Sequence, residues 1–119
     1  MFPTHKAKRL IDNNWVFGWY YPQVCNDKTT LIHYIKDSNG TDWEINPDTV
    51  CRNTGMFVGE FSYPLYEYDK VEFKNFGELI LKFNYKLGQY LLVNKNDVIH
   101  LCGSADNLEN GRIVGNLFD

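Results

Sequence analysis

The sequence predicts a mainly β protein, built as a barrel or a sandwich with little helix. Short stretches that alternate apolar and polar side chains recur along the chain, and turn-forming Gly, Pro, Asn and Asp residues separate them. Hydrophobic residues make up 44% and aromatic residues 16%, which is too apolar for a disordered chain. No stretch has the period of an amphipathic helix of ordinary length. We therefore expect many short strands around one core.

The length of the chain favours one domain. A chain of 119 residues can bury roughly two thirds of its unfolded surface on folding. We expect a single β domain over residues 14–119, preceded by a basic polar head over residues 1–13. The head gathers His5, Lys6, Lys8 and Arg9, a composition typical of a flexible, solvated end.

Residues 15–45 predict a three-stranded sheet. The first strand is residues 15–21, in which Gly18 indicates a bulge or the close approach of another backbone. Residues 29–36 form the second strand, and Asn39-Gly40 provides a tight turn into a short third strand over residues 41–45. Alternation in the first strand places four aromatic side chains on one face: Trp15, Phe17, Trp19 and Tyr21.

The middle of the chain is rich in turns. Pro47 breaks the preceding strand, residues 49–52 extend again, and residues 53–55 turn once more. Residues 56–64 have no clear period and contain Gly59, so we expect a loop there.

The C-terminal half predicts further short strands with turns between them. Residues 70–74 alternate charged and apolar side chains, the pattern of a strand with one wet face. The remaining elements expected are a turn at 75–77, strands at 78–84, 88–93, 97–101 and 112–118, and about one helical turn at 104–108.

Charge and cysteine content restrict the environment and the partners. A net charge of −3 gives no cationic field for duplex nucleic acid. The three cysteines are widely spaced and form no C-x-x-C pair, which argues against a disulfide framework or a zinc finger. No stretch resembles a signal peptide or a membrane span. We expect a soluble, reduced, intracellular protein with no contact with the membrane.

No catalytic group or metal site is predicted. His100 and Cys102 share a strand face, and Asp97 or Asp106 could lie near them. Half-buried His and Cys side chains in a β core are the more common reason for such a pair. The carboxylates of Glu60, Glu67, Asp69 and Glu72 could serve acid–base chemistry or hold a divalent cation, but exposed carboxylates beside a turn are more commonly solubilising groups. No phosphate-binding loop is present in the sequence. We therefore expect no enzyme activity and no cofactor.

The two N-terminal strands are apolar on both faces. One face can cover the core, so the other needs a second layer, a subunit interface or a ligand. Exposed aromatic side chains can also stack on the bases of single strands or nucleotides, usually with basic residues between them. The aromatic side chains in question are Trp15, Trp19, Tyr20, Tyr21, His33 and Tyr34.

Several separate stretches together resemble the YopX family of phage and prophage proteins. The stretches that carry the resemblance are WVFGWY at 15–20, NPDTV at 46–50, NTG at 53–55, LYEYDKV at 65–71 and VGNL at 114–117. The order and spacing of these stretches look like those of the family across most of residues 14–118. The resemblance implies a predominantly β fold with an SH3-like barrel component beside the aromatic sheet, and a phage or prophage origin. It implies no activity.

Three features depart from the family pattern. Tyr68 stands where the family usually has Gly within a Glu-Gly-Asp corner, and Cys51-Arg52 replaces a usual Gly-Gln. The basic head replaces a typical opening strand. Tyr resists the positive φ that Gly adopts freely, so Tyr68 is the position where the turn is expected to differ.

These observations favour a small phage or prophage accessory protein that acts by binding in the cytoplasm of a bacterial host. It would inhibit a host defence or regulatory protein, because aromatic side chains are enriched at the centres of protein interfaces. A homo-oligomer is also compatible with the aromatic faces. The candidate binding residues are Trp19, Tyr20, Tyr21 and Tyr34, with the corner Tyr66, Glu67, Tyr68 and Asp69.

Two alternatives remain open from the sequence. One is a sponge for a nucleotide or another small ligand, in which aromatic side chains stack on the base and basic side chains meet the phosphate. The other is a module that binds single-stranded nucleic acid. The basic side chains considered for phosphate are Lys8, Arg9, Arg52 and Arg112.

Overall fold

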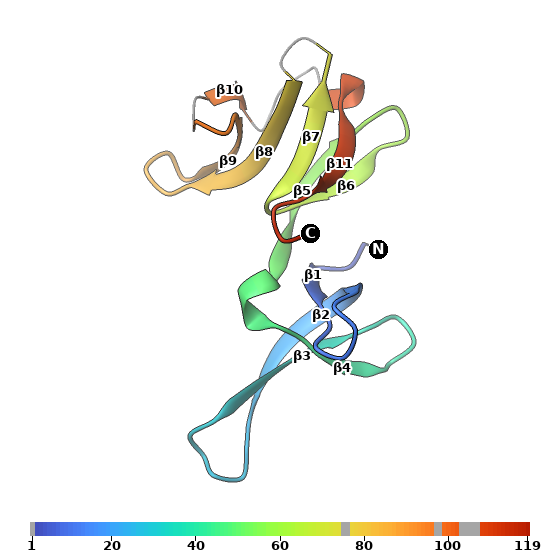
Figure 1. The fold of residues 1–119 in the computed structure, drawn as a ribbon, viewed down its shortest axis with the longest axis vertical. Helices are drawn as coiled ribbons and strands as arrows, with labels where there is room; N and C mark the ends of the chain where they lie inside the picture. Colours follow the sequence, from blue (N-terminus) through green and yellow to red (C-terminus); the bar gives the residue numbers. More distant parts are fainter. Residues whose placement is uncertain (1, 75–76, 97–98, 103–107) are drawn as a thin grey trace. The chain divides into compact units, whose positions relative to one another are not determined.

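The computed structural model describes residues 2–74, 77–96, 99–102 and 108–119 (Figure 1). The side chains of residues 99–102 and 109 also lie outside the description. The mainly β class predicted from the sequence is confirmed. The chain forms two compact units, residues 1–53 and residues 54–119, where we had expected one domain from residue 14 onward.

The first unit is an antiparallel sheet in which four strands lie in the order β4-β3-β2-β1. The strands are β1 (His5–Lys8), β2 (Trp15–Val24), β3 (Leu31–Lys36) and β4 (Asp42–Glu44). A 3-10 turn over Pro47–Thr49 follows, with Asn46 as its cap. The long β2–β3 hairpin is the main feature of this unit (Figure 1). The predicted strands are confirmed, although β2 continues through Val24.

One face of this sheet covers a small core. Alternation places Val16 of β2 and Ile35 of β3 on that face, and Ala7 and Ile45 complete the buried cluster. Tyr20, Trp43 and Val50 pack against the cluster. Gly18 lies on the same face, where an added Cβ would stand 2.0 Å from the carbonyl oxygen of Lys36. The close backbone approach predicted for Gly18 is therefore confirmed.

The basic head contains strand β1, which the sequence analysis did not predict. β1 pairs with β2 in antiparallel register, and Lys6 lies opposite Phe17. It also pairs with the start of β5, where Lys6 lies opposite Cys51. The Lys-Ala-Lys alternation turns the fully buried Ala7 to the core and both lysines to the other face. The head is thus a paired strand, not a flexible end.

The second unit is built on a sheet with the strand order β10-β9-β8-β7-β11. β5 begins in the first unit beside β1 and ends in the second beside β6. The elements are β5 (Cys51–Val58), β6 (Tyr63–Tyr66), β7 (Asp69–Phe73), β8 (Gly77–Asn84), β9 (Gln89–Val93), β10 (Ile99–Cys102), a 3-10 turn (Leu108–Asn110) and β11 (Arg112–Asn116).

Alternating apolar side chains make the core of the second unit. Alternation over residues 78–84 predicts that Leu79, Leu81 and Phe83 point inward. Leu79 and Leu81 of β8 are fully buried together with Leu92 of β9, whereas Phe83 is half-buried. Val71 and Phe73 contribute from β7. The other members of the cluster are Val58, Leu65 and Leu108.

The loop predicted over residues 56–64 is wrong in part. β5 continues through Val58 and β6 starts at Tyr63, so the connection is a short turn over residues 59–62. Gly55 lies inside β5 with φ of 77°, where a turn had been predicted. Parts of the turn predicted at 75–77, the strand at 97–101 and the helical turn at 104–108 lie outside the described residues.

The expected barrel is not closed within the described residues. Their strands form two open antiparallel sheets. β4, β6, β10 and β11 stand at the ends of the two strand orders, so they are the edge strands among the residues that the structure describes.

Candidate binding surface

Aromatic side chains line the face of the first sheet that is turned away from its core. Trp15, Phe17, Trp19 and Tyr21 alternate along β2 with the core-facing residues, and Tyr34 lies opposite Tyr21 on β3. Phe17 and Trp19 remain 43% and 42% exposed. We call these five residues the aromatic face. The ladders of the sheet set their positions: β2 pairs with β3 without a shift in register from Trp19 to Val24, and Trp15 and Phe17 pair with β1.

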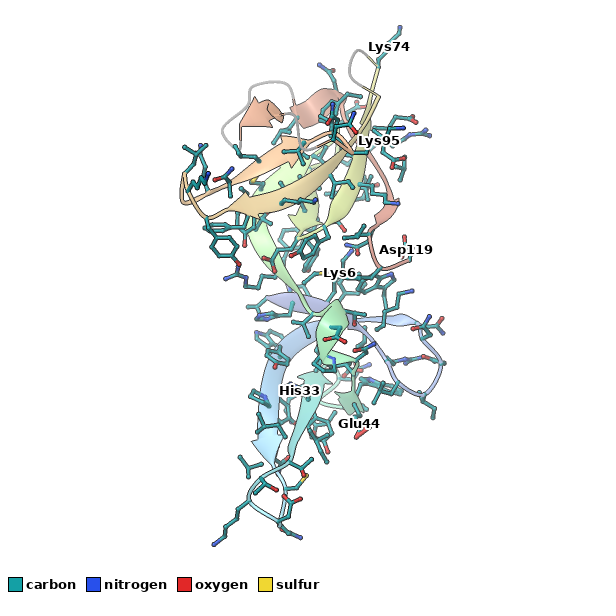
Figure 2. All side chains as sticks on the ribbon, turned by 60° about the vertical axis from the view of Figure 1, so that its left-hand side comes forward. Lys6, His33, Glu44, Lys74, Lys95 and Asp119 are labelled. Atoms are coloured by element: carbon teal, nitrogen blue, oxygen red, sulfur yellow. The ribbon has the colours of Figure 1, made fainter. Side chains whose placement is uncertain are left out.

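Two lysines of β1 lie beside the start of the aromatic face. The ammonium nitrogen of Lys6 is 4.6 Å from the centroid of the Trp15 ring, and that of Lys8 is 5.1 Å from it. Figure 2 labels Lys6 on its strand. Such cation–π contacts stabilise by about 0.5–1 kcal/mol at exposed sites and by more where the cation is desolvated, and both lysines are buried. The β1–β2 register produces them, since it places Lys8 opposite Trp15.

The other end of the aromatic face carries a polar network. The rings of Tyr21 and Tyr34 stack with centroids 5.4 Å apart. Desolvation, and then a hydrogen bond to Asp42, raise the pKa of the Tyr21 hydroxyl. Hydrogen bonds from Tyr21 and Lys36 lower the pKa of the Asp42 carboxyl, and Lys36 Nζ lies 3.2 Å from that carboxylate. At neutral pH Tyr21 is therefore a neutral donor held by an ionised partner.

Tyr20 does not belong to this surface, contrary to the prediction. It lies on the opposite side of β2 and packs against the core of the first unit. Its hydroxyl is 2.7 Å from Nδ1 of His33, and the two rings are stacked. Figure 2 labels His33 on β3. Strict alternation along β2 separates Tyr20 from Trp19 and Tyr21.

The acidic corner is also not an exposed surface. Tyr66, Glu67 and Asp69 are buried, and Asp69 is only 1% exposed. Asp69 accepts a hydrogen bond of 2.9 Å from the backbone N–H of Tyr66 and another of 2.9 Å from the side chain of Asn116. The corner is a structural turn between β6 and β7, so a partner cannot reach its carboxylates.

Tyr68 makes this turn with the backbone conformation of a glycine. Its φ is 66°, in the left-handed region. The conformation is held by two backbone hydrogen bonds: Tyr68 N–H donates to Leu81 and the Tyr68 carbonyl accepts from Leu117. The Tyr68 ring packs edge-on against Phe118 at 5.4 Å. Tyr68 therefore adopts a φ that Gly takes more readily, and these hydrogen bonds and this ring contact accompany it.

The remaining candidate groups of the sequence analysis are His and Cys side chains and carboxylates. They contain no group of three or more His, Cys, Asp or Glu side chains placed to hold a metal ion. The side chains of His100 and Cys102, and Asp97 and Asp106, lie outside the description. Cys25 is a half-buried thiol, and the buried thiol of Cys51 donates a hydrogen bond to the carbonyl of Thr49 at 3.3 Å. Within the described part of the chain, no helix is both long and apolar enough to cross a membrane.

One feature of the second unit was missed by the sequence analysis. A cavity of about 520 Å³ lies where the β5–β6 turn meets the start of β11. Phe61 and Tyr63 line it and are exposed. These residues stood in the stretch read as a loop, where the period that marks a strand is interrupted. Two aromatic residues within three positions, close to Gly59, were the signal available in the sequence.

Comparison with known proteins does not assign this chain to a family. The chain matches no protein-family model, and it has no match among the curated proteins.

Proposed function

We propose that this protein is a small phage or prophage accessory protein that binds and inhibits a host defence or regulatory protein through its aromatic face. The observation that carries the proposal is the row of five aromatic side chains on an outward sheet face, with Phe17 and Trp19 more than two-fifths exposed. Aromatic side chains present large contact areas that lose little entropy on binding, and they dominate the energetic centres of interfaces.

The charge of the first unit supports a protein partner over nucleic acid. Residues 1–53 contain six basic and six acidic side chains, so the unit that carries the aromatic face is neutral overall. Binding to a phosphate backbone depends on an excess of cationic groups. A neutral surface with exposed aromatic rings is typical of the centre of a protein interface, where charged residues are depleted.

The resemblance to the YopX family supports the phage or prophage origin, and with it the cytoplasm of a bacterial host as the place of action. The proposed role needs neither a catalytic group nor a cofactor. A protein of this kind acts by occupying a surface of its target, so its effect scales with its affinity for that target.

Capture from a bacterial lysate tests this function when variants are compared. Trp19→Ala removes the most central exposed ring of the aromatic face, whereas Tyr85→Ala removes a ring that is more exposed than Trp19, 85% against 42%, from the β8–β9 turn of the second unit. We expect the wild type and Tyr85→Ala to retain the same protein at equal yield and Trp19→Ala to lose it. Equal retention by all three variants would refute the role of the aromatic face.

A second function, binding of single-stranded nucleic acid, is favoured by one observation. Lys6 and Lys8 lie over Trp15, so cations and stacking surfaces occur side by side. Both lysines are buried, which reduces what they can offer to phosphate. Retardation of a single-stranded oligonucleotide that weakens with added salt would support this function over a protein partner. Stabilisation by nucleotides alone would instead support the small-ligand sponge.

A further inference from the structure

The cavity of the second unit combines apolar walls with a charged rim. Its floor includes Val58, the last residue of β5, and the buried Gly111 just before β11. An added Cβ at Gly111 would stand 2.7 Å from the Phe73 ring and 2.8 Å from the Val58 side chain. The absence of a side chain at Gly111 thus lets the chain pass close to the core at the base of the cavity. All lining residues belong to the second unit.

Two aromatic rings and an aliphatic side chain provide the walls. Phe61 and Tyr63 meet edge to face with their centroids 6.4 Å apart, and Ile113 of β11 also lines the cavity. Phe61 is 75% exposed, so most of the apolar surface of its ring remains in contact with water and is available to a partner. The turn that carries it is itself strained, because Ser62 has a φ of 55°.

The rim has one carboxylate that is not neutralised. Arg112 Nη2 lies 2.6 Å from Glu72 Oε1, so the charge of Arg112 is balanced by its neighbour across the β7–β11 pair. Glu60 also lines the cavity and has no ion pair with any residue that the structure describes. Residues 54–119 carry nine acidic and six basic side chains, so the surrounding field is negative as well.

We propose that this cavity binds a lysine or arginine side chain of a partner protein, with its alkyl stem between Phe61, Tyr63 and Ile113 and its cation at Glu60. Each part of such a side chain meets a matching part of the cavity. The alkyl stem removes apolar surface of the walls from water, as long basic side chains do elsewhere. The cation is attracted both by the Glu60 carboxylate and by the faces of the aromatic rings.

The size and position of the cavity fit a side chain carried on a polypeptide. Its volume lies within the range of about 300–1,000 Å³ common to ligand sites, and it exceeds what one side chain fills. β11 stands at the end of its strand order, where an extended segment of a partner could lie alongside it. This site is separate from the aromatic face, so the proposal stands or falls independently of the function given above.

Binding of three small probes to the ¹⁵N-labelled full chain tests the proposal. The probes are the Nα-acetyl, N-methylamide derivatives of lysine, of its uncharged isostere norleucine, and of glutamate. We expect the lysine probe to shift the backbone amide signals of Gly59, Phe61 and Gly111 in a saturable way. The norleucine probe should bind at least about threefold more weakly, the size of a partly exposed charge contact, and the glutamate probe should not bind.

Two variants complete the test. Glu60→Gln removes the carboxylate from an exposed turn and should abolish the preference for lysine over norleucine. Glu78→Gln, which removes an exposed carboxylate on β8 outside this cavity, should keep that preference. Equal binding of lysine and norleucine by the wild type would overturn the proposal. So would preferred binding of glutamate, which would assign the rim to Arg112, or the absence of any saturable shift.

Discussion

The side chain of Asn116 reaches from the end of β11 to the buried carboxylate of Asp69, which is 47 positions earlier in the chain, with Nδ2 and Oδ1 2.9 Å apart. The same amide nitrogen donates to the carbonyl of Glu67 at 3.1 Å. Asn116 is 2% exposed and Asp69 1%. One amide therefore fastens the C-terminal strand to the turn between β6 and β7.

Asn116→Ala should destabilise the second unit by about 2–3 kcal/mol, because it leaves a buried carboxylate without one of its donors. Urea unfolding followed by circular dichroism measures this change. Leu117→Ala, at the exposed neighbouring position, is the control and should change the free energy of unfolding by less than about 0.5 kcal/mol. Equal effects of the two substitutions would show that the Asn116–Asp69 contact contributes little.

At Tyr68, the free-energy cost of a strained backbone is offset by the packing of the ring against Phe118. A residue other than Gly with φ of 66° carries about 1–2 kcal/mol of strain, whereas the edge-on contact with Phe118 returns about 0.5–1.5 kcal/mol. Tyr68→Gly should therefore change stability by less than about 1 kcal/mol in the wild type. In a Phe118→Ala background, where the packing is already lost, the same change should stabilise by about 1 kcal/mol. Thermal unfolding of the four proteins measures both values, and an identical effect in the two backgrounds would exclude the compensation.

Gly18→Ala should disrupt the first sheet. The new methyl group would stand 2.0 Å from the carbonyl oxygen of Lys36, so β2 and β3 would have to separate locally, at a cost of about 3 kcal/mol or more. Gly40→Ala is the matched control, because it has free space around the new methyl group and suffers only from its positive φ of 82°. We expect its cost to be about 1–2 kcal/mol by chemical denaturation. A cost for Gly18→Ala as low as that of Gly40→Ala would contradict the close approach.

The stability of the β2–β3 hairpin depends on the pH through the ionisation of Asp27. It accepts hydrogen bonds from the Thr30 hydroxyl at 2.6 Å and from the N–H groups of Thr29 and Thr30 at 3.0 and 2.9 Å. The Thr30 hydroxyl bond, and then the backbone bonds, lower the pKa of Asp27 to about 2. The unfolded value is about 3.9, so the contribution is complete above that pH and is lost as the pH falls toward 2. The difference in melting temperature between wild type and Asp27→Asn should shrink over this interval. A difference that is constant from pH 6 to pH 2 would exclude the effect.

Local periodicity was enough to predict the elements that bear the aromatic face. Alternation over β2 and β3 assigned the correct faces, because one side of each strand covers a core and the other does not. The same pattern identified Leu79 and Leu81 as inward residues of β8. The sequence pattern also separated Tyr20 from Trp19, although the predicted binding patch combined them.

Features that depend on distant partners were not predictable from local pattern. β1 is only four residues long, and its strand character comes from pairing with β2 and β5. The burial of Asp69 depends on Asn116, far along the chain, so a carboxylate beside a turn looked like a surface group. In the β5–β6 hairpin, Gly59 lies in the turn and Pro64 lies in β6. Both residues are uncommon inside strands, so the alternating pattern that marks a strand is not visible there in the sequence.

The most direct measurement of the proposed function is the affinity of the captured host protein, once purified, for variants of the aromatic face by isothermal titration calorimetry. We predict that Trp19→Ala weakens binding about 30-fold or more, as loss of a central aromatic anchor does, and that Tyr85→Ala changes it by less than about twofold. An affinity of Trp19→Ala within twofold of the wild type would contradict the account.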